Sequence, residues 1–131
     1  MKKIAIGGGQ GFWGDSPDAA IHMIRKADIQ YLGCDYLAEL TLSIMAKQQL
    51  KDPTKGYSRL LEYRMSQVLK PAKEHGVKII TNMGAVNPHA AVMKVMEIAK
   101  EQGITGLKFA AVTGDFSGQI KRIKEKNIPL V

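Results

Sequence analysis

The chain has 131 residues, 45% of them hydrophobic and 24% charged, which is typical of a single soluble globular domain. It has no apolar run near the roughly 18 residues that a membrane span needs and no signal-peptide core. Its one cysteine, Cys34, excludes an internal disulfide and suits the cytoplasm. The net charge of +7 favours an anionic partner. The basic residues are scattered and not interleaved with aromatics, so we expect no nucleic-acid partner.

Apolar periodicity predicts strands that alternate with helices. In chain order the expected elements are a strand at 3–6, a helix from Ser16-Pro17, a strand at 29–34, helices at 38–50 and 58–75, a strand at 77–81, a helix from Pro88 to Gly103, a strand at 107–112, a helix at 117–126 and the start of a fifth strand at 128–131. Ser16 is expected to cap its helix, Pro71 to kink or divide the helix at 58–75, and Gly76 to cap that helix.

Strands joined by helices pair in parallel through right-handed crossovers. We therefore predict one α/β domain whose parallel sheet has about four to five strands flanked by helices, either Rossmann-like or open and doubly wound.

Polar residues gather after the expected strands. In parallel sheets a ligand binds beyond the carboxyl ends of the strands. The segments at those ends are rich in Gly, Asp and Asn, whereas the turns at the opposite edge are plainer; these segments are 7–15, Asp35-Tyr36, 82–84 with Asn87, and 113–115. The asymmetry predicts one shared site for a small molecule.

The glycine-rich stretch matches G-x-G-x-x-G over residues 9–14, and Asp35 falls where a dinucleotide fold has its ribose-binding acid. The expected helix, however, starts only at Ser16-Pro17, after the glycines. Asp15 and Asp18 also place negative charge where phosphates need a positive field. An NAD(P)-dependent enzyme is therefore the weaker alternative.

We favour a ligand loop of another kind, in which Gly8, Gly9 and Gly11 present backbone amides. The remaining alternative is a tight structural turn with Trp13 as its packing anchor.

Carboxylates are expected at the same edge. Asp15, Asp35 and Asp115 are the candidate catalytic acid and base groups. Each can equally cap a helix, and Glu39 can simply favour a helix N-terminus. We predict no metal site and no particular cofactor from this pattern.

Asn82, Gly84 and Asn87 complete the candidate ligand-binding set. An asparagine amide can orient a ligand carbonyl, and it can also stabilise a turn. Both roles stay open for Asn82, whereas Asn87 before Pro88 favours a helix cap.

Several segments together resemble the N-terminal region of the acyclic terpene utilisation (AtuA-like) family, in order over essentially the whole chain. These segments are 7–17, 35–41, 51–53 with 56–57, 76–88 and 112–115. Family members are longer, so the resemblance implies that 1–131 is the N-terminal part of a longer architecture. It also implies a place in bacterial terpene catabolism and a small carboxylate or acyl-coenzyme A substrate. It supplies no catalytic residues.

Besides the weaker NAD(P)-dependent alternative, two readings of function therefore remain. The first is a domain that binds or processes such a substrate, and whether it is an enzyme stays open. The second is a non-enzymatic or truncated module whose sheet is completed by a partner chain or a second copy.

Overall fold

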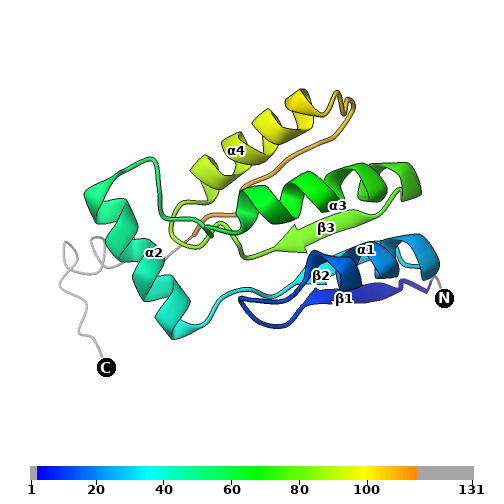
Figure 1. Ribbon diagram of the computed structural model, residues 1–131, viewed down its shortest axis with the longest axis horizontal. Helices are drawn as coiled ribbons and strands as arrows, with labels where there is room; N and C mark the ends of the chain where they lie inside the picture. The colour runs from blue at the N-terminus through cyan, green and yellow to red at the C-terminus, as the bar shows by residue number, and fades with distance from the viewer. Residues whose placement is uncertain (1–2, 115–131) are drawn as a thin grey trace, which may run out of the picture.

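The computed structural model describes residues 3–114, which form three strands and four helices (Figure 1). In chain order these are β1 (Ile6–Gln10), α1 (Pro17–Lys26), β2 (Tyr31–Cys34), α2 (Glu39–Lys51), α3 (Leu61–His75), β3 (Lys78–Thr81) and α4 (Pro88–Glu101). The predicted helix at 117–126, the strand start at 128–131 and Asp115 lie outside the described residues. None of the described helices is long and apolar enough to cross a membrane.

The three strands form one parallel sheet in the order β1-β2-β3. Tyr31 of β2 lies in register with Ile6 on one side and with Lys78 on the other. The α/β class and the parallel pairing are thus confirmed. The sheet is smaller than the predicted one.

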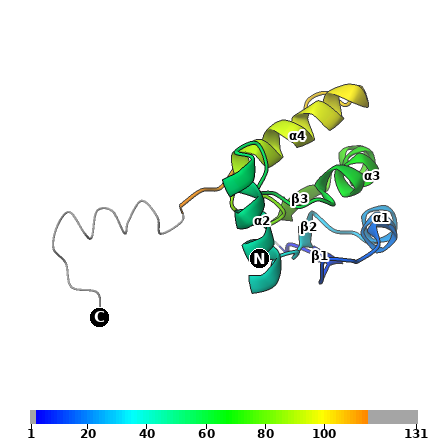
Figure 2. The ribbon, with the colours of Figure 1, turned by 60° about the vertical axis from the view of Figure 1, so that its left-hand side comes forward.

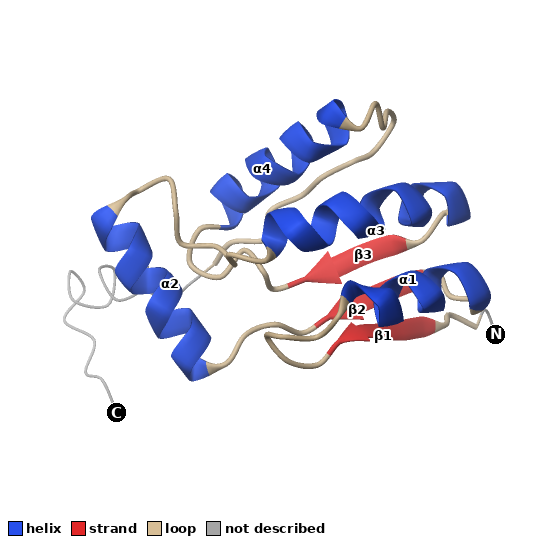
Figure 3. Cartoon of the chain, viewed as in Figure 1, coloured by secondary structure: helices blue, strands red, loops and turns tan. Residues whose placement is uncertain are grey.

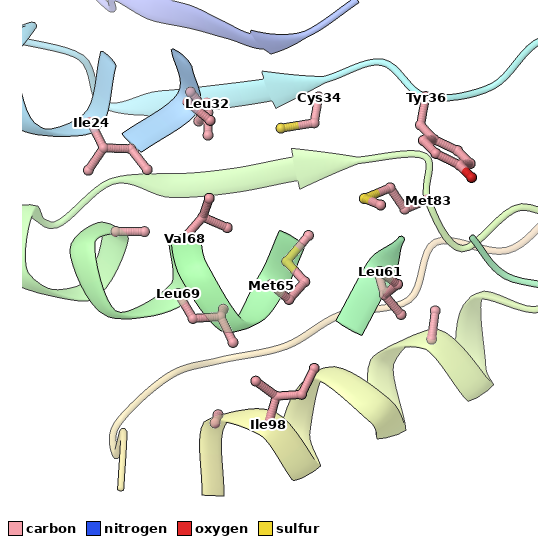
Figure 4. Packing of buried hydrophobic residues seen from close by; sticks show 14 of the residues in the cluster. Ile24, Leu32, Cys34, Tyr36, Leu61, Met65, Val68, Leu69, Met83 and Ile98 are labelled. Carbon is pink, nitrogen blue, oxygen red and sulfur yellow. The ribbon is translucent and has the colours of Figure 1, made fainter. Parts of the chain in front are cut away.

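One face of the sheet holds the core. Helices α1 and α3 pack on each other and on that face, and α4 packs on α3 (Figure 2). Leu32 and Cys34 of β2 lie in one cluster of buried side chains with Met65 and Val68 of α3 (Figure 4). The opposite face carries Ile6 and Ile80, which are 70% and 61% exposed, so no element within residues 3–114 covers it.

The predicted strand at 107–112 is wrong. This segment returns beside α4 as an irregular connection without strand pairing (Figure 1). Its side chains still alternate between partly buried and exposed, and Leu107 and Phe109 pack against the core. A cavity of about 910 Å³ is lined by both this segment and β3. The alternation predicted the half-buried pattern correctly, but the segment makes no ladder with β3, and the cavity lies between them.

The first strand also differs from its prediction, since β1 runs from Ile6 to Gln10 instead of over 3–6. Glycines 7–9 therefore belong to the strand. A Cβ on Gly7 would lie 2.7 Å from Met23 Cγ of α1, and one on Gly9 would lie 2.8 Å from Leu32 Cγ. The glycines let β1 approach α1 and β2 closely.

Helix α3 continues through Pro71, so of the two predicted effects the division is wrong and the kink stays a prediction. Pro71, Leu69 and Ala72 are all buried, and this burial offsets the lost backbone hydrogen bond. Gly76 ends the helix with a φ of 69°, which confirms the predicted cap.

Candidate functional site

The carboxyl ends of the three strands meet at one edge of the sheet. Their arrowheads point toward α2, and the loops after β1, β2 and β3 all begin there (Figure 3). The local pattern explains this convergence, because each loop leads from the end of a parallel strand into the next helix.

Asp35 and Asn82 are brought together at this edge. The Asn82 amide Nδ2 donates to Asp35 Oδ1 at 2.7 Å, and the Tyr36 backbone N–H donates to Asn82 Oδ1 at 2.8 Å. Asn82 thus ties the end of β2 to the end of β3. Both side chains are exposed, so a ligand could reach the second amide hydrogen of Asn82 and the outer carboxylate oxygen of Asp35.

Asp15 closes the glycine loop on itself. Its carboxylate Oδ2 accepts from the Gly11 N–H at 2.6 Å and from the Phe12 N–H at 3.1 Å. The Trp13 ring packs on the Tyr36 ring with a centroid separation of 5.3 Å. In this structure the Gly11 amide is therefore occupied by Asp15 and not presented to a ligand.

The other candidate glycines differ in their surroundings. A Cβ on Gly8 would meet nothing within 4 Å, whereas one on Gly84 would lie 2.9 Å from Pro88 Cα. Gly9 packs against Leu32 in the same way. Close packing thus accounts for Gly9 and Gly84, and Gly8 faces open space.

Asn87 has a structural role, and its predicted cap is confirmed. Its Oδ1 accepts from the Ala90 N–H at 3.3 Å at the start of α4. Its Nδ2 donates to the carbonyls of Pro53 and Lys55, at 3.0 and 2.8 Å. Both amide hydrogens are therefore already used within the protein.

The start of α1 bears on the dinucleotide alternative. Ser16 caps this helix by accepting from the Asp18 N–H at 3.1 Å, and Pro17 is its first residue. The helix N-terminus thus follows the last glycine of 9–14, where the sequence predicted it. A pyrophosphate on the glycines would not meet the amides of this helix.

No group of three His, Cys, Asp or Glu side chains within residues 3–114 is arranged to hold a metal ion. Asp15 and Asp35 each bind groups of the protein instead. Asp115, the third candidate acid, lies outside the described residues.

The cavity of about 910 Å³ runs beside β3, between α3, α4 and the segment 106–112. Side chains of these three elements make it largely apolar; they include Leu61, Met65, Leu69, Val92, Leu107 and Phe109. Asn82 and Gly84 line it at the carboxyl end of β3, and it extends along the strand to Lys78 and Lys73 at the amino end. A second cavity of about 260 Å³ lies around Gly103 and Ile104, after the end of α4 and away from the strand ends.

Arg64 is the residue that sequence reasoning missed. Its side chain is 1% exposed, and its guanidinium donates to the backbone carbonyl of Asp15. One signal could have found it. Arg64 stands three residues after Leu61 and one before Met65, among the buried residues of α3, and a charged residue at such a position requires an explanation.

Two other ionisable groups lie near this guanidinium. Burial raises the pKa of the Tyr36 hydroxyl, while Ser58, Arg64 and Arg59 lower that pKa in part. Burial likewise raises the pKa of the Cys34 thiol, against a lowering effect of Arg64. Both groups are therefore uncharged at neutral pH.

Comparison with known proteins gives one match. Residues 4–129 match the model of the family described as acyclic terpene utilisation family protein AtuA. No curated protein and no solved structure gave a match. Since the family model covers nearly the whole sequence, the chain belongs to the acyclic terpene utilisation family AtuA.

Proposed function

We propose that this domain binds a small carboxylate or an acyl-coenzyme A-type compound of acyclic terpene utilisation at the carboxyl edge of its sheet. One observation carries the proposal: the apolar cavity of about 910 Å³ is lined at the strand ends by Asn82 and Gly84. Ligand pockets typically measure about 300–1,000 Å³ and combine apolar walls with a few polar groups. The family context supports an apolar, chain-like substrate.

The polar groups at the edge suit the head of such a ligand. Asn82 has one amide hydrogen left after its bond to Asp35, which can donate to a carbonyl oxygen. Asp35 retains a carboxylate oxygen that can accept a hydrogen bond from a hydroxyl group or take up a proton. The apolar tail then lies against Met65 and Leu69 of α3.

Binding can be measured as a shift in melting temperature with octanoate and octanoyl-coenzyme A. Val92→Trp places a large ring in the cavity that Val92 lines. The ligand concentration needed for a given shift in melting temperature should therefore rise at least tenfold. Met93→Trp on the same helix is the matched control, because Met93 is 59% exposed and does not line that cavity. Equal shifts in the two variants would contradict the proposal.

The second candidate is a module that assembles with another chain. It is favoured by the free outer edge of β3, which pairs with no strand within residues 3–114, and by Ile80, which is 61% exposed. Strand addition to such an edge is a common mode of association. Light scattering measures the mass in solution, and a monomer that captures no partner would count against this candidate.

A further inference from the structure

The guanidinium of Arg64 is buried without a counter-ion among residues 3–114. Its Nη2 donates to the Asp15 carbonyl, but Nε and Nη1 have no hydrogen-bond partner in the described part of the chain. Arginine stays charged in proteins and carries five N–H donors. An unpaired buried charge is strongly unfavourable, so a buried arginine normally has an anion beside it.

The carboxylates placed at this edge do not supply that anion. Asp15 directs its carboxylate to the amides of Gly11 and Phe12, and Asp35 directs its own to Asn82. The Asp15 contact with Arg64 is made by the backbone carbonyl alone.

Two further buried polar atoms lie at this end of the sheet, the Tyr36 hydroxyl and Gln10 Oε1. The Tyr36 hydroxyl has the Ser58 side chain as a neighbour, but neither atom makes a hydrogen bond of normal geometry within the described residues. Tyr36 is 2% and Gln10 8% exposed. Gln10 pairs in register with Cys34, whose thiol senses the Arg64 charge. Thus β1, the loop after β2, and α3 each carry a buried polar group without a hydrogen bond among the described residues.

The glycine loop covers this region. Trp13 packs on Tyr36, the Asp15 carbonyl binds Arg64, and Gln10 Nε2 holds the Phe12 carbonyl at 3.0 Å. A ligand therefore reaches Arg64 only when the loop moves. This movement must break the hydrogen bond from the Gly11 N–H to the Asp15 carboxylate.

We propose that Arg64 and Tyr36 form a binding site for a carboxylate beneath the glycine loop, outside the cavity beside β3, whose lining includes neither residue. The inference goes beyond the proposed function, since it adds a second place at which this protein binds a carboxylate. The carboxylate accepts from Nε and Nη1 of Arg64 and from the Tyr36 hydroxyl, and so supplies the absent counter-ion. Gln10 and the loop exclude water from this charge pair.

The test compares octanoate with 1-octanol at one pH and ionic strength, in the natural chain and in Arg64→Met. Arg25→Met is the control, because Arg25 lies exposed on α1. Octanoate should stabilise the natural chain and the control more than octanol does. Arg64→Met should lose this surplus and bind octanoate roughly ten- to hundredfold more weakly. Without ligand it should melt no lower than the natural chain, because an uncompensated charge has been removed.

Each outcome separates the two proposals. Octanoate binding that is unchanged in Arg64→Met overturns the inference and leaves the proposed function intact. Failure of both compounds to bind the natural chain overturns both. If Arg64→Met does not fold, Tyr36→Phe and Arg64→Lys decide, and unchanged octanoate affinity in both overturns the inference. If Asp115→Asn and Arg64→Met prove strongly coupled without ligand, the protein itself supplies the anion, and the inference is wrong.

Discussion

Gly8 and Gly9 are neighbours in β1, yet an alanine should have opposite effects at the two positions. A Cβ on Gly9 would lie 2.8 Å from Leu32 Cγ and 2.9 Å from both Leu32 methyl carbons. Leu32 is 0% exposed and belongs to the buried core cluster, so it cannot move away freely. Overpacking of this kind costs about 1–3 kcal/mol. Gly9→Ala should therefore lower the free energy of unfolding by that amount.

Gly8→Ala is the matched control, because a Cβ there meets nothing within 4 Å and the backbone φ is not positive. It should leave stability unchanged or raise it by about 0.4–1 kcal/mol through the unfolded state. Urea denaturation measures both variants, and about 4 °C of melting temperature accompanies each kcal/mol. Equal stability of the two variants would refute the packing explanation of Gly9 and restore a ligand-binding role as its main reason.

Three further predictions concern the surroundings of the site. Because Cys34 is buried, and burial also raises the pKa of its thiol, it should react with a disulfide reagent at pH 8 no faster than the protein unfolds; fast reaction in the native state would contradict this. Hydrogen bonds from Thr54 hold the pKa of Asp52 below its usual value. The stability that Asp52 contributes is thus present above its unfolded pKa and lost as the pH falls through the folded one. NMR titration should show a higher Asp52 pKa in Thr54→Val, and an unchanged value would refute the assignment. Asn87→Ala removes the α4 cap and two bonds to the 53–55 loop, so it should cost about 1–3 kcal/mol in thermal melts; a loss below about 0.3 kcal/mol would show that the cap is not needed.

Local chemistry was enough to predict most helix ends. Ser16 before Pro17 and Gly76 after His75 satisfy backbone groups within a few residues, so their effect is visible in the sequence. The alternation of strands and helices is also visible in the sequence, and it predicted the parallel α/β class because strands joined by helices pair in parallel. The meeting of Asp35 with Asn82 followed from the topology alone, because parallel strands end at one edge.

The errors concern interactions between distant residues. The segment 107–112 has a strand pattern, but its packing against the core depends on β3, α3 and α4 together, and no ladder with β3 forms. The sequence predicts a loop for the glycines of β1, because it does not show that Met23 and Leu32 pack closely against them. Arg64 was missed because its burial depends on the Asp15 carbonyl, 49 residues away in the chain.

Amide chemical shifts measured during titration with octanoate test the central claim most directly. If the ligand occupies the cavity beside β3, the amides of Thr81, Asn82 and Gly84 should shift together with those of 107–111, all of which line that cavity. The Asn82 side-chain amide should shift with them. Shifts confined to Gly103 and Ile104 at the smaller cavity, or no shifts at millimolar octanoate, would contradict binding at the carboxyl edge of the sheet.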